Sequence, residues 1–157
     1  MSIGYFATLV EANTYFEDER LETDAWDDLE ELSGDTLKTK VLKNGYNRIY
    51  YDPRWSLPTY AEASSVALVE LHKANAEMAY YLCLHLADED RRKGLQAQGV
   101  TGAGIVKEQY SEKMLMELPV PPFVIAILKP WATGKSFAAV NVARDDDESV
   151  TTKVHDF

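Results

Sequence analysis

The sequence predicts a mainly α-helical fold, in which a small helical bundle surrounds one long central helix and carries a β-hairpin insertion and an extended C-terminal arm. Residues 64–87 contain no Gly or Pro and begin at serines suited to an N-cap. The apolar residues of this stretch cover nearly its whole circumference at helical spacing. Capping, glycine and proline signals divide the rest of the chain into shorter elements. A length of 157 residues fits a single domain.

The chain before the central helix predicts two or three helices. Thr8 and Glu11 form a capping box, which opens a helix ending near Arg20. An acidic stretch with a short helix around Trp26 follows. A further helix over residues 37–51 ends at Asp52, because the residue before a proline avoids the helical region.

The central helix is too apolar for an ordinary surface helix. Its polar strip consists of Glu70, Lys73 and Glu77 alone, whereas a surface helix keeps about half its circumference polar. A chain this short is expected to cover only part of the apolar surface, leaving the rest to a neighbouring subunit. The side of the helix assigned to that neighbour carries Val69, Ala76 and Cys83.

After the central helix, which is expected to end before Gly94, the pattern changes. Alternating residues around a glycine-rich turn predict the hairpin over residues 95–110. A short apolar helix over 123–128 begins after Pro121 and Pro122, stops at Pro130, and is expected to pack on the central helix. The helical domain therefore spans residues 1–131, and residues 132–157 form the arm.

The sequence offers no organised chemistry. One cysteine and three histidines without ligand spacing argue against a zinc site, and Gly134-Lys135-Ser136 lacks the remaining glycine of a phosphate-binding loop. No nucleophile motif is present, so we expect no enzyme, no cofactor and no metal. The longest apolar run is broken by prolines and too short for a membrane span, and the first residues lack a basic leader. These features predict a protein made in a reducing cytoplasm, with no membrane partner.

Two adjacent segments carry opposite charge. Residues 17–31 hold nine acids against one arginine, whereas residues 36–60 hold five cations against Asp52 alone. The cations lie among Tyr and Trp residues, which is the composition of a single-stranded nucleic-acid site. A second interpretation is that the aromatic rings pack inward and the cations face solvent. A third interpretation is a head-to-tail contact between subunits, which closes into a ring. The charged candidates for that subunit interface are Lys38, Lys40, Lys43, Arg48, Asp24, Asp27 and Asp28.

The order of these features resembles the head–tail connector (adaptor) proteins of tailed bacteriophages, including their branch of DnaT-like single-stranded DNA-binding proteins. The resemblance covers roughly residues 3–131. It rests on the capped first helix with Ala12, Tyr15 and Phe16, on Trp26, on the Trp55/Pro58 connection, on the long alanine-rich helix, and on the proline-led helix ending at Trp131.

The resemblance implies a structural virion protein at the head–tail junction, typically a dodecameric ring under the portal protein. Such a ring extends the channel through which double-stranded DNA passes without sequence-specific binding, and it docks the next neck or tail component. The C-terminal arm would contact the portal, and its candidates are Phe137, Val140, Val142, Val150 and Phe157. A net charge of −10 suits a channel wall that repels phosphates. The alternative function is a single-stranded DNA-binding replication accessory that uses residues 38–60.

Overall fold

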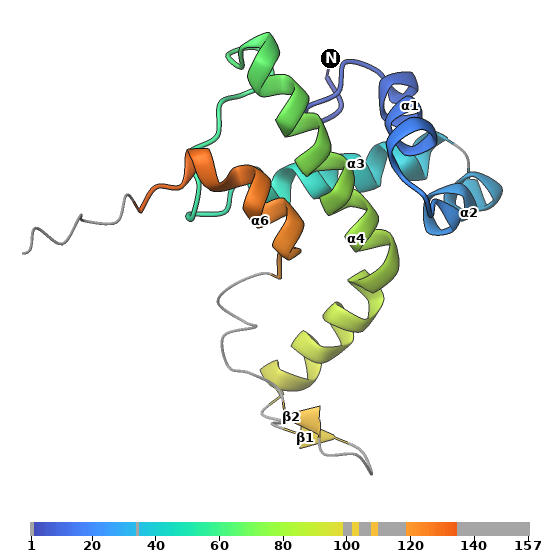
Figure 1. The fold of residues 1–157 in the computed structure, drawn as a ribbon. Helices are drawn as coiled ribbons and strands as arrows, with labels where there is room; N and C mark the ends of the chain where they lie inside the picture. The colour runs from blue at the N-terminus through green and yellow to red at the C-terminus, as the bar shows by residue number, and fades with distance from the viewer. Residues whose placement is uncertain (1, 34, 99–101, 104–107, 110–118, 135–157) are drawn as a thin grey trace, which may run out of the picture.

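The computed structural model describes residues 2–33, 35–98, 102–103, 108–109 and 119–134. This part of the chain is mainly helical, as expected, and α4 packs against α1, α2, α3 and α6 (Figure 1). In chain order the elements are α1 (Leu9–Glu19), α2 (Asp24–Ser33), α3 (Asp35–Tyr50), α4 (Ser65–Ala97), β1 (Gly102–Ala103), β2 (Glu108–Gln109), α6 (Pro122–Leu128) and the 3₁₀ turn η1 (Lys129–Trp131).

The first helix begins where the capping box predicts, but the Glu11 carboxylate binds the Ala7 amide instead of the Thr8 amide. The Glu11 amide donates to Thr8 Oγ1 at 3.4 Å, and Glu11 Oε2 accepts from the Ala7 amide at 2.8 Å. Thr8 is in the extended conformation of an N-cap residue, and α1 ends at Glu19, one residue before the expected end. The short helix expected around Trp26 is α2.

Two hydrophobic clusters lie on different sides of α4. One joins α4 to α3, α6 and the chain before α1; it contains Tyr5, Ile49, Leu71, Met78, Val124 and Leu128. The other joins α4 to α1, α2 and α3; it contains Phe6, Phe16, Trp26, Leu42, Ala76 and Tyr80. Figure 1 shows the same arrangement, with α6 on one side of α4 and α1 and α2 on the other. The chain therefore covers most of the apolar circumference of α4 by itself.

Gly45 explains how closely α3 approaches α4. The sequence marks this glycine as a weak point in a helix, where it costs about 1 kcal/mol relative to alanine. In the fold, a Cβ at Gly45 would lie 2.9 Å from the Ala79 backbone nitrogen. The missing side chain lets the backbones of α3 and α4 approach each other closely, and this close approach offsets the cost in helix propensity.

The central helix continues past the predicted end. It passes through Gly94 and reaches Ala97, so the expectation of a stop before Gly94 is wrong. Lys93 pairs with Glu89 one turn earlier, and Glu89 in turn binds Arg48 of α3. Both residues of the Lys93–Glu89 pair precede Gly94, so these contacts stabilise the helix up to that glycine.

The predicted hairpin and arm are largely outside the described residues. Residues 95–97, expected to start the first strand, belong to α4. Beyond them, two residues of β1 pair antiparallel with two of β2, Gly102 opposite Gln109. The five portal-contact candidates, Phe137, Val140, Val142, Val150 and Phe157, also lie outside the described residues.

The start of the expected arm joins the helical body. Ala132 forms an isolated bridge with Trp55, and the Thr133 amide donates to the Arg54 carbonyl at 2.9 Å. The Thr133 hydroxyl also donates to the Pro53 carbonyl at 2.8 Å. The chain after η1 is thereby fixed to the connection between α3 and α4.

Candidate functional site

Two of the five cations of the basic segment, residues 36–60, pack inside the molecule. Lys38 is 3% exposed, and its ammonium lies 5.0 Å from the Trp26 ring centroid. Arg48 Nη1 donates to both carboxylate oxygens of Glu89 at 2.8 Å. Both side chains are enclosed by their own chain, which leaves little of either open to a subunit interface.

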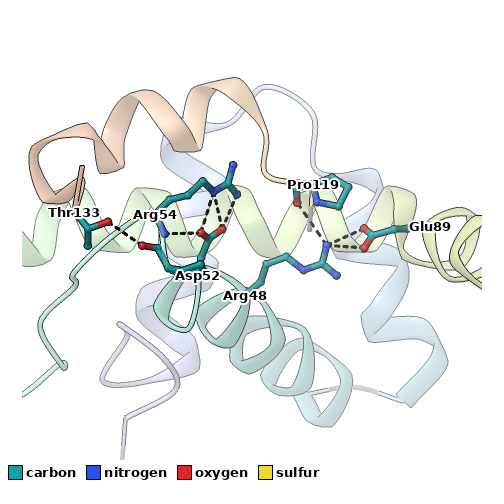
Figure 2. Close-up of polar contacts among 7 residues, drawn as sticks. Arg48, Asp52, Arg54, Glu89, Pro119 and Thr133 are labelled. Carbon is teal, nitrogen blue, oxygen red and sulfur yellow. Dashed lines mark hydrogen bonds and ion pairs between the residues drawn. The ribbon is translucent and has the colours of Figure 1, made fainter. Parts of the chain in front are cut away.

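The Arg48–Glu89 pair joins three parts of the fold (Figure 2). Glu89 lies on α4 and is 2% exposed, and Arg48 of α3 also approaches the Pro119 carbonyl ahead of α6 at 3.5 Å. Burial alone would raise the pKa of Glu89, but the hydrogen bonds from Arg48 and Lys93 outweigh it and lower that pKa. The carboxylate therefore stays ionised in the fold and acts as an anchor for the second half of α4.

A second ion pair rigidifies the connection between α3 and α4. The Arg54 backbone amide and guanidinium both donate to the Asp52 carboxylate, at 2.9 Å for the amide (Figure 2). Burial would raise the Asp52 pKa, but these hydrogen bonds lower it overall. The single acid of the basic segment is thus bound to one of that segment's own cations.

The aromatic residues of the basic segment are also partly used in packing. Trp55 is 7% exposed and belongs to the core, and the rings of Tyr46 and Tyr50 stack on each other with centroids 5.0 Å apart. Tyr51 is 76% exposed. A hollow of about 370 Å³ beside α3 is lined by Lys43, Tyr46, Asn47 and Tyr60, among others. What remains for a ligand is one open ring, this hollow and the two exposed lysines.

Those lysines are Lys40 and Lys43, which have no ion pair with another described residue. The acidic candidates Asp24, Asp27 and Asp28 are likewise exposed on α2, where Asp27 accepts a hydrogen bond from the Thr23 hydroxyl at 2.6 Å. Opposite charges therefore remain on separate helices of the same chain.

The three apolar interface candidates of α4 have different environments. Ala76 is fully buried on the face of α4 that packs against Phe16 and Trp26, so none of its surface is open to a neighbouring subunit. Cys83 is half-buried, and burial raises the pKa of its thiol to about 11. Val69 is 53% exposed and is the candidate that remains open to a partner.

The polar strip of α4 is also mostly occupied. Glu77 accepts from the Tyr15 hydroxyl at 3.0 Å and pairs with Arg20, whose guanidinium lies 3.6 Å from the Tyr80 ring centroid. Lys73 Nζ pairs with Glu19 at 3.1 Å. Two residues of the strip, Lys73 and Glu77, therefore bind α1 and its C-cap residue, whereas Glu70 is exposed.

A groove between α1 and α4 is the feature that sequence reasoning missed. It measures about 200 Å³, and its lining includes Phe6, Glu11, Thr14, Asp18, Val69, His72 and Lys73. The His72 ring stacks on Phe6 with centroids 4.7 Å apart, and its Nε2 is buried with no hydrogen-bond partner among the described residues. Burial lowers the pKa of His72, although the Glu11 charge and a backbone hydrogen bond with Tyr5 act in the opposite direction.

The signal for this groove was present but divided between distant segments. Glu11, Thr14 and Asp18 lie at positions i, i+3 and i+7 of α1, which places them on one face. Val69 and His72 come from α4, more than fifty residues later. Only the packing of α1 on α4 brings the two sets together.

The described residues also bear on metal binding and on membrane insertion. No group of three His, Cys, Asp or Glu side chains there is placed to hold a metal ion. Within the same part of the chain, no helix has the length and apolarity needed to cross a membrane. Comparison of the chain with protein-family models, with curated proteins and with solved structures finds no match.

Proposed function

We propose that the chain is a structural subunit of a tailed-phage head–tail connector. In this proposal it forms a ring, of twelve copies as in the family it resembles, between the portal protein and the next neck or tail component. The virion neck is then its site of action after synthesis in the host cytoplasm. Double-stranded DNA passes through the ring without sequence-specific contacts.

The observation that carries the proposal is the separation of exposed charge on a tightly packed helical body. Lys40 and Lys43 lie on α3, whereas Asp18, Asp24 and Asp28 lie exposed on α1 and α2 without an ion pair to another described residue. Opposite surfaces on one rigid subunit favour head-to-tail contacts between copies, and such contacts close into rings. The net charge of −10 further suits a passage that DNA must leave freely.

The alternative, a single-stranded DNA-binding accessory, has one observation in its favour. The hollow beside α3 brings Lys43 together with Tyr46 and Tyr60, which combines a cation with aromatic rings. Against it, Lys38, Arg48 and Arg54 all have partners within the chain, and Trp55 is buried. Two exposed lysines give a weak track for a phosphate backbone.

Fluorescence polarisation with a labelled single-stranded oligonucleotide distinguishes the two functions. The connector is expected to show no saturable binding at moderate salt. The accessory would bind with an affinity that falls steeply as salt rises, and Tyr51→Ala would weaken it by about 1–3 kcal/mol if that open ring stacks on a base. Tight binding at moderate salt contradicts our proposal.

Electron microscopy of purified particles carrying a labelled copy of the chain tests the connector role directly. We expect the label at the head–tail junction, and a label elsewhere or absent from particles contradicts the proposal. The proposed portal contact through residues 132–157 is tested by removing only residues 135–157, because Ala132 and Thr133 bind the helical body. The truncated chain should fold normally but no longer enter particles.

A further inference from the structure

The groove between α1 and α4 has the chemistry of a docking site for lysine side chains. Phe6 and Val69 give it apolar lining, and Val69 is 53% exposed. On the α1 side, Asp18 has no ion pair with another described residue, and within the described part of the chain Glu11 accepts from the Ala7 amide. Lys73 also lines the groove, but its charge is paired with Glu19, so the groove keeps an excess of negative charge. A lysine combines an apolar stem with a compact charge. Its stem can therefore pack on the apolar lining while its ammonium group reaches the carboxylates of Glu11 and Asp18.

The matching surface lies on α3 of the same sequence. Lys40, Lys43 and Asn47 are all exposed and occupy positions i, i+3 and i+7 of the helix. Glu11, Thr14 and Asp18 have the same spacing on α1. Each set therefore forms one stripe along two helical turns, about 10 Å long. One stripe offers two carboxylates and a hydroxyl, and the other offers two ammonium groups and an amide.

These stripes do not pair with each other within one chain. None of the ion pairs in the described part of the chain joins α1 to Lys40 or Lys43. Both helices are fixed on α4 by buried side chains, Phe16 for α1 and Leu42 for α3. Bringing the stripes together within one subunit would require unpacking that cluster.

We propose that the α1–α4 groove of one subunit binds the α3 stripe of a second copy of this chain. The contact is heterologous, since it joins two different surfaces. One subunit of the pair keeps a free stripe and the other keeps a free groove, and each can bind a further copy. The proposal deepens the connector function and rests on it, because it names the surfaces that join neighbouring subunits. It also replaces the sequence-based pairing, in which the enclosed residues Lys38 and Arg48 contributed to the contact.

Single charge reversals test the contact. Asp18→Lys reverses the groove and Lys43→Glu reverses the stripe, and both residues are exposed without ion-pair partners among the described residues. Matched controls are Asp90→Lys on α4 and Lys129→Glu on η1, which make the same charge changes at exposed positions elsewhere. Circular dichroism checks that all four variants fold.

Sedimentation equilibrium of the full chain, from micromolar to millimolar concentration at low and high salt, gives the readout. The wild-type chain should self-associate, more weakly at high salt. Each reversal should raise the dissociation constant at least about tenfold, because attraction becomes repulsion, and the controls should change it little. An equimolar mixture of Asp18→Lys and Lys43→Glu should associate more tightly than either variant alone, since the reversed groove faces the reversed stripe.

Three outcomes overturn this interface. They are a wild-type chain that remains monomeric at millimolar concentration and low salt, controls that weaken association as much as the test variants, and a mixture no tighter than its components. None of them contradicts the connector function, which is judged by location in particles and by oligonucleotide binding. Rings that form independently of Asp18 and Lys43 would leave the function standing and remove only this contact.

Discussion

The two halves of α4 are stabilised by different interactions. Residues 65–82 pass between two hydrophobic clusters, and Leu71, Ala76 and Met78 there have no exposed surface. Residues 83–97 continue beyond α1, α2 and α6 (Figure 1). Their deepest contact is the Glu89 carboxylate, bound by Arg48.

This difference shows how one helix can serve both as a core and as an extension. Apolar burial is additive over many side chains, so the first half tolerates the loss of any single polar contact. The second half depends on a buried ion pair, which is costly to desolvate and destabilising to break. The three predictions below separate these two cases, beginning with the largest effect.

A charge in the first half should unfold the protein. Ala76→Asp places a carboxylate in the tightly packed apolar cluster of Phe6, Phe16 and Trp26, and we expect a loss of more than about 4 kcal/mol. That approaches the whole stability of a small domain. Urea unfolding monitored by circular dichroism measures it.

The matched control is Ala87→Asp in the second half, where the alanine is exposed. It should cost less than about 1 kcal/mol, mainly through helix propensity. If the two substitutions are equally tolerated, the first half is not enclosed by its own chain. The surplus apolar face would then belong to a neighbouring subunit after all.

Breaking the anchor should loosen mainly the second half. Arg48→Met leaves Glu89 buried with Lys93 as its remaining cation, at an expected cost of about 2–3 kcal/mol. Hydrogen exchange should then rise at the amides of residues 83–97 and remain slow in residues 65–82. The double variant Arg48→Met/Glu89→Met should be less destabilised than Arg48→Met alone, because no buried charge is left with too few partners.

Uniformly faster exchange along α4 would contradict the comparison, since it would mean that both halves open as one unit. A double variant as unstable as the single would assign the cost to lost packing of the arginine stem rather than to charge.

Sequence patterns predicted the helices well, because caps and prolines act within a few residues. Thr8 and Glu11 gave the start of α1, and Pro53 and Pro130 gave the ends of the helices before them. The helical spacing of α4 also showed correctly that its apolar surface is nearly continuous. The pattern could not show what covers that surface, because the covering residues Tyr5, Trp26 and Val124 come from three distant segments.

The candidate interface was less predictable for the same reason. Exposure of a lysine depends on its tertiary neighbours, so sequence alone could not separate Lys38, which lies over Trp26, from Lys40 two residues later. Glu89 lies in a run of charged residues, 88–93, and only the approach of α3 makes it the buried partner of Arg48. The α1–α4 groove likewise exists only after packing.

The smallest expected effect is a pH dependence that differs between the two halves. In the first half, burial lowers the pKa of His72, so the fold favours the neutral ring and loses stability as pH falls below its ordinary value of 6.5. In the second half, the pKa of Glu89 is lowered, so its contribution is complete above 4.5 and is lost as pH falls through the lower folded value. His72→Phe keeps a ring for the stack on Phe6, and it should flatten the stability profile where that profile begins to fall, just below pH 6.5. Glu89→Gln should flatten the profile only below pH 4.5.

Urea unfolding of both variants across this range checks the assignment, and hydrogen exchange locates the half of α4 that loses stability. A His72→Phe profile that still falls just below pH 6.5 would contradict it.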